Sequence, residues 1–236
     1  GREHELTALD SLLDGVIDEH CPRAVIVTAA AGIGKSRLRH EFLHRIGSRR
    51  EPVHVLVGRC DPLSMGVPLF ALADMVRKHF GLQGGDDPER ARTQLKGRLA
   101  ALPGVAVSLE CELIGELISL PFPDEGLPLL AAARQDGQLF RSLLLRALAS
   151  WLQRLCGQAP VLMVFEDLHW SDVLSVTLLE DLLRSLKEAP LAILALARPE
   201  ALERFPKLWS AHAQVIPTGP KSMHQPRKAP APCRPA

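Results

Sequence analysis

The chain has 236 residues, of which 47% are apolar and 23% charged, and its formal net charge is +1 at pH 7. A chain of this length and apolar content can bury the core of one sizeable α/β domain, with room for an inserted subdomain. With so small a net charge, the chain has no strong electrostatic attraction to nucleic acid or to an anionic membrane. We therefore expect neither as a direct partner.

The sequence carries no recognisable export or membrane signal. Its best apolar run, Leu191 to Ala197, has the length of a strand and is too short to span a membrane. The five cysteines are odd in number and none has metal-ligating spacing, which favours reduced thiols. These features predict a cytoplasmic location.

The N-terminal segment predicts a helix followed by a strand, a loop and a second helix. Leucine and valine recur at helical spacing over residues 3–19. Ala24 to Thr28 is a β-branched apolar run, typical of a strand buried on both faces of a parallel sheet. Small residues from Ala29 to Gly34 form the loop, and the second helix is expected from about Lys35 to Ile46.

Strands and helices continue to alternate along the chain. Further strands are predicted at 53–57, 161–165, 191–197 and 213–216. Further helices are predicted at 68–80, 88–101, 106–119, 136–156 and 172–187, whereas the proline-rich stretch 121–135 is predicted to be a loop or irregular crossing. This alternation indicates an α/β fold with a parallel sheet and helices on both faces, and a helical insert at about 82–135 between the second and third strands.

The C-terminal residues differ in composition from the rest. Residues 219–236 are rich in proline, contain Lys and Arg, and include no acidic residue. Such a segment cannot bury enough apolar surface to fold, so we expect a disordered tail after a domain that covers residues 1–218.

A phosphate-binding loop is the strongest motif. Residues 29–36 match x-x-x-x-x-G-K-[ST] between a strand and a helix. Glycines allow the backbone to approach a phosphate closely, successive N–H groups form an anion cradle, and the helix N-terminus adds partial positive charge. The alternative is a glycine-rich turn without a ligand. We assign nucleotide binding to Ala29, Ala30, Ala31, Gly32, Ile33, Gly34, Lys35, Ser36 and Arg37, with Lys35 reaching the β/γ-phosphates and Ser36 ligating Mg²⁺.

A second motif is an acid pair at the end of an apolar strand. Val161 to Phe165 is followed by Glu166 and Asp167, in the form of a Walker B motif. By position, Glu166 takes the metal role and Asp167 orients the attacking water, although both are candidate Mg²⁺ ligands and the order of acids is inverted relative to most similar motifs. The alternative is a helix cap or a solvated acidic turn.

Three more polar or aromatic residues lie near the predicted strand ends, of which Arg198 is a candidate site residue. We interpret Trp170 as a residue that packs in the core and His169 as a hydrogen-bonded side chain. Arg198 follows the strand 191–197 and either senses the γ-phosphate, since a guanidinium matches phosphate geometry, or is a surface residue.

Together these motifs resemble the AAA-like ATPase domains of bacterial STAND proteins, which are joined to LuxR-type regulators, nucleotide cyclases or serine/threonine kinases. The resemblance rests on GREHEL at the start, AGIGKSRL, the phrase FEDLHWSD at residues 165–172, and ARP at 197–199. It covers about residues 1–218. It implies a five-stranded sheet of order 5-1-4-3-2, with Arg2 near the adenine and Arg198 at the sensor-1 position.

The resemblance also implies a helical lid that we do not find in this sequence. We therefore expect a domain truncated before the lid, or a tail that replaces it, for instance after a frameshift. Partners implied are effector or sensor domains of the same or a neighbouring chain, and a nucleotide-dependent oligomer is possible for this class.

The expected function is an ATP-binding signal-transduction module that binds ATP with Mg²⁺ and hydrolyses it slowly to switch contacts. A module that binds ATP or ADP without turnover is the first alternative, and a P-loop kinase of a small substrate is the second. The sequence lacks the N-K-x-D motif of GTPases and the LSGGQ-like signature of ABC ATPases, and its basic residues are spread along amphipathic helices rather than gathered in a nucleic-acid patch.

Overall fold

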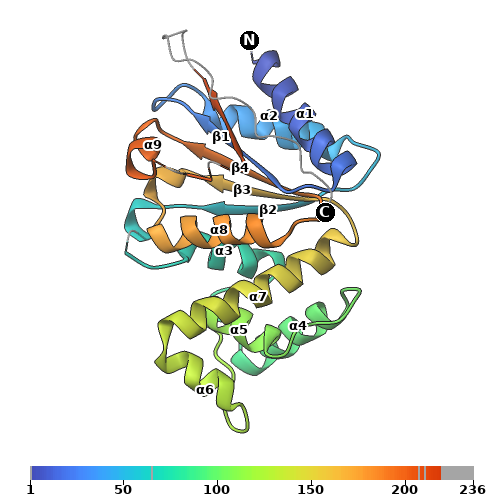
Figure 1. Cartoon of the computed structure of the whole chain (residues 1–236), viewed down its shortest axis with the longest axis vertical. Helices are drawn as coiled ribbons and strands as arrows, with labels where there is room; N and C mark the ends of the chain where they lie inside the picture. Colours follow the sequence, from blue (N-terminus) through green and yellow to red (C-terminus); the bar gives the residue numbers. More distant parts are fainter. Residues whose placement is uncertain (1, 65, 207, 210, 219–236) are drawn as a thin grey trace.

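The computed structural model describes residues 2–64, 66–206, 208–209 and 211–218. Within these residues one parallel sheet has the strand order β2-β3-β4-β1-β5. This is the predicted order 5-1-4-3-2 counted from the other edge, so the α/β fold class is confirmed (Figure 1). The strand bounds are β1 (Arg23–Thr28), β2 (His54–Arg59), β3 (Val161–Glu166), β4 (Leu191–Ala197) and β5 (Ala213–Pro217). The predicted disordered tail 219–236 lies outside the described residues.

The helices follow the predicted pattern, except for α6, described below, and for the short α9, which was not predicted. Two short 3₁₀ turns, η1 (Pro62–Ser64) and η2 (Leu168–Trp170), follow β2 and β3. The α-helices are α1 (Glu3–Glu19), α2 (Lys35–Gly47), α3 (Phe70–His79), α4 (Pro88–Ala100), α5 (Glu110–Leu117), α6 (Pro128–Gln135), α7 (Gly137–Cys156), α8 (Val173–Ser185) and α9 (Glu200–Arg204).

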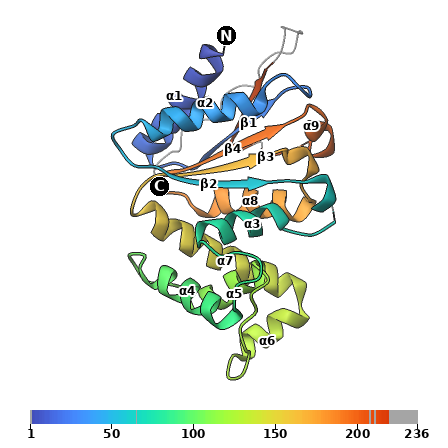
Figure 2. The same cartoon turned by 180° about the vertical axis from the view of Figure 1, so that it is seen from behind.

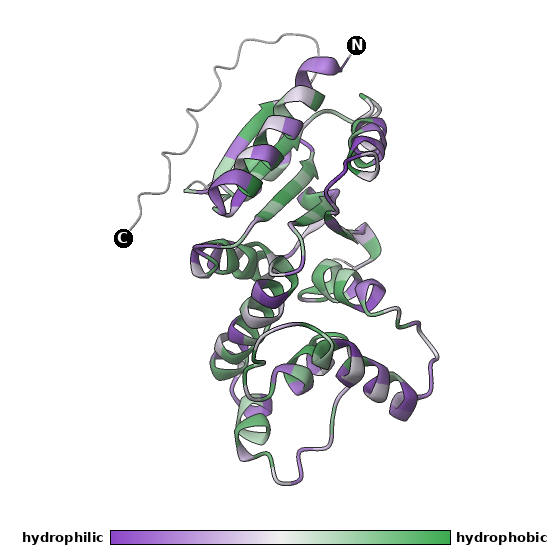
Figure 3. Ribbon diagram, turned by 90° about the vertical axis from the view of Figure 1, so that its right-hand side faces the viewer, coloured by the Kyte–Doolittle hydropathy of each residue, from purple (hydrophilic) through white to green (hydrophobic). Residues whose placement is uncertain are grey.

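The sheet separates two apolar layers because successive side chains of a strand point to opposite faces. Val25 and Val27 of β1 pack with α1 and α2, whereas Ala24 and Ile26 belong to the larger core beneath α3, α7 and α8. Figures 1 and 2 show α1 and α2 on one side of the sheet and α3, α7 and α8 on the other. Strands β1, β3 and β4 are therefore buried on both faces. Figure 3 shows a largely hydrophobic sheet between helices that carry both hydrophobic and hydrophilic residues.

Helices α4, α5 and α6 lie beyond α7, away from the sheet (Figure 1). They pack through α5 and α6 onto α7 and through α4 onto α5. A buried ion pair between Glu110 and Arg154 joins α5 to α7, and the same guanidinium donates to the Leu99 carbonyl of α4 at 2.8 Å. This layer lies in the region predicted as a helical insert; the division into domains stays a prediction.

The prediction of a loop at 121–135 is wrong for the second half of this stretch, where α6 forms. Pro128 occupies the first turn of this helix. Proline is favourable there, because its missing N–H would be unpaired in any case and its fixed φ suits a helix. The sequence pattern alone predicts a break, because proline ends a helix when it lies in the interior.

The expectation of reduced thiols is met at three of the cysteines. Cys60, Cys111 and Cys156 are free thiols, and burial raises the pKa of each to about 12. None of the helices in the described ranges combines the length and the apolar character that crossing a bilayer requires.

Candidate functional site

The loops that follow β1, β3 and β4 meet at one edge of the sheet. Strand β4 lies between β1 and β3, and Thr28 is level with Ala197 while Phe165 is level with Ala195. Because all strands are parallel, the predicted phosphate loop, the acid pair and Arg198 all follow carboxyl ends (Figure 1). The fold thus brings together motifs that are far apart in the sequence.

The phosphate loop has the conformation that an anion cradle requires. Gly32 and Gly34 have φ of 76° and 87°, in the region that favours glycine. Gly34 caps α2 without a side-chain hydrogen bond, and within the described residues the amides of Gly34, Lys35 and Ser36 donate to no backbone or side-chain acceptor. These free N–H groups and the partial positive charge of the α2 N-terminus fit a phosphate.

Lys35 folds over this loop. Its ammonium group donates to the carbonyls of Ala29 and Ala30, at 2.8 and 3.1 Å. Burial lowers the pKa of Lys35, opposed by the nearby Asp167 carboxylate and assisted by the positive charge of Arg198. The amine therefore stabilises the loop through two carbonyls while it is within the influence of the Asp167 charge.

Arg2 reaches the same loop from the start of α1. A Cβ placed on Gly34 would lie 3.3 Å from Nη2 of Arg2, and Nη1 of Arg2 is buried without a hydrogen-bond partner. Helix α1 is held on α2 by Arg45, whose guanidinium pairs with Glu3 at 2.6 Å and with Asp10 at 3.0 Å. The structure thus places the Arg2 guanidinium against the phosphate loop, and its expected proximity to an adenine stays a prediction.

The two acids after β3 have different surroundings. Glu166 forms an ion pair with Arg39 of α2 at 2.7 Å, and the two side chains are 18% and 27% exposed. Asp167 has a positive φ of 52°, which turns the chain sharply at the strand end, and its carboxylate accepts no capping hydrogen bond. Asp167 is the acid whose charge acts on the Lys35 amine.

The residues present fit a magnesium ion that is shared with phosphates. Mg²⁺ keeps several waters and takes one or two carboxylates in phosphate sites. Ser36 is exposed at the start of α2, and its hydroxyl makes no hydrogen bond within the described part of the chain. No group of three or more His, Cys, Asp or Glu gathers among the described residues, so Ser36, Glu166 and Asp167 would need phosphate and water oxygens to complete an octahedral shell.

His169 is not the hydrogen-bonded histidine that the sequence suggested. Its side chain is buried, and neither Nδ1 nor Nε2 has a partner in the described structure. Burial lowers the pKa of His169; the Asp167 charge opposes this shift, and the Arg198 charge adds to it. Trp170 packs on the ring with centroids 5.0 Å apart, so the packing part of the interpretation is confirmed.

Arg198 and Arg37 have contrasting positions. Arg198 is half-buried directly after β4, and its charge acts on both Lys35 and His169. Arg37 is 80% exposed and pairs with Glu41 along α2 at 2.8 Å. The structure therefore gathers Arg198 with the candidate site but does not bring the Arg37 side chain there.

Sequence reasoning missed Arg39 as a partner of the acid pair. Arg39 lies on α2 three residues after Ser36, almost one helical turn, and thus on the side of the helix that carries the loop. Only the placement of β3 relative to α2 brings Glu166 to it. The helical spacing from Ser36 was the one signal available in the sequence.

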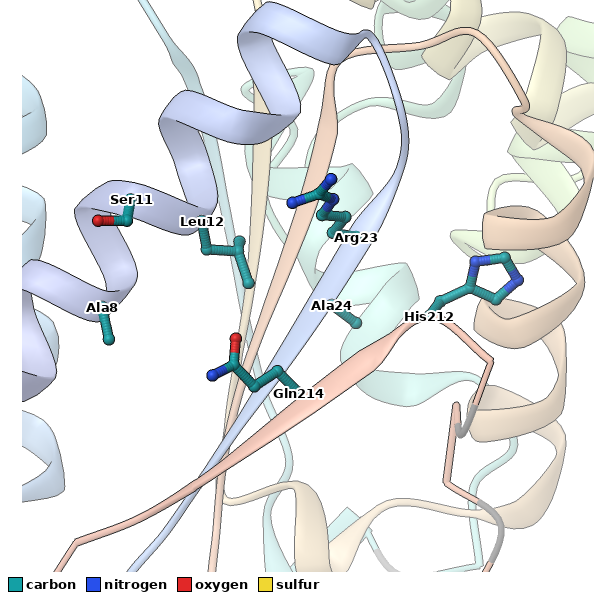
Figure 4. Close-up of a pocket in the computed structure, with 7 residues that line it drawn as sticks. All are labelled: Ala8, Ser11, Leu12, Arg23, Ala24, His212 and Gln214. Atoms are coloured by element: carbon teal, nitrogen blue, oxygen red, sulfur yellow. The ribbon is translucent and has the colours of Figure 1, made fainter. Parts of the chain in front are cut away.

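A cleft elsewhere in the molecule is separate from this site. It has a volume of about 260 Å³ and lies between α1 and the first residues of β1 and β5 (Figure 4). The side chains that line it are Ala8, Ser11, Leu12, Arg23, Ala24, His212 and Gln214. These strand residues are at the amino end of the sheet, opposite the phosphate loop.

Comparison with known proteins agrees with the geometry. The model of the AAA ATPase domain family matches residues 1–194, a range that includes the phosphate loop and the acid pair and ends before Arg198. An uncharacterized protein of Rhizobium meliloti (strain 1021), R02095, is 27% identical over 199 residues, which are 84% of this chain and 18% of that protein. The chain thus spans about a fifth of that relative's length. With the family model covering most of the sequence, the chain belongs to the AAA ATPase domain family.

Proposed function

We propose that the chain is an ATP-binding signal-transduction module of the STAND class, which binds ATP with Mg²⁺ and hydrolyses it slowly. The observation that carries this proposal is the set of unpaired amides at Gly34, Lys35 and Ser36, with the Lys35 amine beside them. Free backbone donors at a helix N-terminus are suited to an anion, and the glycine-rich loop with the Lys35 amine beside them adds what a phosphate chain requires.

The chemistry of the individual residues supports slow hydrolysis. Lys35 would exchange its two carbonyl acceptors for β- and γ-phosphate oxygens, and Ser36 with Glu166 would hold Mg²⁺. Asp167 would orient the attacking water, and Arg198 would stabilise negative charge at the γ-phosphate. Magnesium, when bound, neutralises phosphate charge; the protein residues position the reacting groups.

The proposal of partner domains is supported by the similarity to a much longer protein. The chain spans 18% of R02095, as a module within a multidomain protein would. Effector or sensor domains of the same or a neighbouring chain are the proposed partners, and the γ-phosphate would favour one arrangement of contacts over another.

One observation favours a second candidate, a module that binds nucleotide without turnover. The ion pair with Arg39 already engages one oxygen of Glu166, so this acid is less available to a metal. Phosphate release measured with purified chain and ATP–Mg²⁺ separates the two. Turnover that disappears in the Glu166→Gln, Asp167→Asn double variant supports the ATPase; ATP binding without turnover supports the second candidate.

Replacing Lys35 tests the binding site itself. Loss of a charge-assisted contact costs about 1.5–3 kcal/mol, so Lys35→Ala should weaken ATP binding roughly ten- to a hundredfold or more. Calorimetric titration with ATP and Mg²⁺ measures this change. Lys78→Ala is the matched control, because Lys78 is exposed and pairs with Asp74 on α3. Equal ATP affinity for wild type and Lys35→Ala would contradict the phosphate-loop assignment.

A further inference from the structure

His169 combines burial with two unpaired ring nitrogens. The side chain is 8% exposed, and both Nδ1 and Nε2 lack a hydrogen-bond partner in the described structure. An imidazole carries at least one N–H donor in either protonation state. A buried donor or acceptor without a partner is unfavourable, so this ring fits a site in which a ligand supplies the missing partner.

The surrounding chain fixes the position of the ring. Arg204 of α9 donates to the His169 carbonyl at 2.9 Å, and the Trp170 amide donates to the Asp167 carbonyl at the same distance. The Trp170 ring packs against the imidazole. These contacts hold the backbone and pack one ring against the other while leaving both imidazole nitrogens without a partner, an arrangement suited to a preorganised ligand contact.

The charges around the imidazole come from segments that follow three different strands, β1, β3 and β4. Those that act on it belong to Asp167, Arg198, Lys35 and Glu200. Lys35 belongs to the phosphate loop, Asp167 follows β3, and Arg198 follows β4. The unpaired ring thus lies in the electrostatic neighbourhood of the lysine expected at the β/γ-phosphates.

We propose that a ring N–H of His169 donates a hydrogen bond to the terminal phosphate of bound ATP, which makes His169 a residue that distinguishes ATP from ADP. This inference rests on the proposed function. Phosphate oxygens are strong acceptors, and only the triphosphate presents the γ group. The bond would form with ATP and be lost with ADP, so the imidazole contributes to the affinity for one nucleotide and not for the other.

The test compares two substitutions at this position. His169→Phe keeps a ring of similar shape without a donor, and His169→Asn keeps a donor in a smaller side chain. Calorimetric titrations use ADP, ATP and the non-hydrolysable β,γ-imido analogue of ATP, each with Mg²⁺. We expect His169→Phe to weaken ATP and analogue binding about ten- to a hundredfold while ADP binding stays unchanged. His169→Asn should recover part of the lost ATP affinity.

A second histidine provides the control. His54 also has a buried unpaired nitrogen, Nε2, but it starts β2 at the opposite edge of the sheet. His54→Phe should leave the ratio of ATP to ADP affinity unchanged, and thermal unfolding verifies that each variant is folded. Equal weakening of both nucleotides in His169→Phe, or no change in either, would overturn the proposal. Wild-type chain that binds neither nucleotide would instead overturn the proposed function.

Discussion

The ion pair between Arg39 and Glu166 lies where the strand β3 ends beside α2. Both side chains are mostly buried, which sets this pair apart from exposed salt bridges that contribute little. Arg39 also has a buried Nε without a partner. Removing the guanidinium would leave the Glu166 carboxylate partly desolvated and uncompensated, and such a loss exceeds the net value of the pair itself.

The Arg39→Met substitution tests this at the residue scale. It retains the apolar stem and removes the charge, so we expect the free energy of unfolding to fall by about 1–3 kcal/mol in nucleotide-free protein. Urea unfolding of Arg39→Met, Glu166→Gln and the double variant forms a cycle. The free energy of unfolding of the double variant should fall by less than the sum of the two decreases in the single variants. Strictly additive losses would contradict a coupled pair.

The start of α8 is joined to the start of α3 by one carboxylate. Asp172 caps α8 by accepting from the Ser175 amide at 2.8 Å. Its other oxygen accepts from the Leu69 amide at 3.1 Å, across 103 residues of sequence. Leu69 caps α3 with a positive φ of 61° and no side-chain cap of its own. One side chain therefore stabilises two helix starts on the same side of the sheet.

At the element scale, Asp172→Ala should destabilise the protein more than Asp136→Ala does. The Asp136 side chain caps α7 by accepting from the amides of Gln138 and Leu139, and within the described residues it accepts from no other element. Losing a cap costs about 1 kcal/mol, and the additional unpaired Leu69 amide should add about 1 kcal/mol for Asp172. Equal midpoints of urea unfolding for the two variants would show that the long-range bond contributes nothing.

Across the whole molecule, the apolar core beneath the sheet includes a half-buried histidine between α3 and α7. His79 ends α3 and packs its ring on Phe80 and on Trp151 of α7, with centroids 5.0 and 5.4 Å apart. Burial, followed by the charges of His54 and Arg98, lowers the pKa of His79 to about 4. The folded protein therefore holds this ring neutral where the unfolded chain would protonate it.

This difference predicts a loss of stability in mild acid. The His79 contribution is fully present above the unfolded pKa of about 6.5, and it is lost as the pH falls from there toward about 4. Urea unfolding of wild type and His79→Phe between pH 7.5 and 4.5 measures the slope, which should be shallower in the variant. His4→Gln at the exposed start of α1 should retain the wild-type slope. Parallel curves for wild type and His79→Phe would contradict the linkage.

The sequence predicted the parts of the fold that depend on local pattern. Apolar β-branched runs identified each strand within one or two residues, because a strand buried on both faces needs continuous apolar side chains. The glycines of the phosphate loop were recognisable for a similar reason, since the positive φ at Gly32 and Gly34 disfavours other residues. Helix α6 was missed because the meaning of Pro128 depends on its place in the helix.

The sequence by itself determined the α/β class, the strand–loop–helix around the phosphate loop and the acid pair after β3. Only the tertiary structure decided which side chains meet there: Arg39 on Glu166, Arg2 on Gly34, and the unpaired ring of His169 near Lys35. Backbone preference and hydrophobic period act between near neighbours in the sequence, so they are readable from it. Pairing of polar groups depends on which loops the sheet order brings to one edge, and no local spacing encodes that.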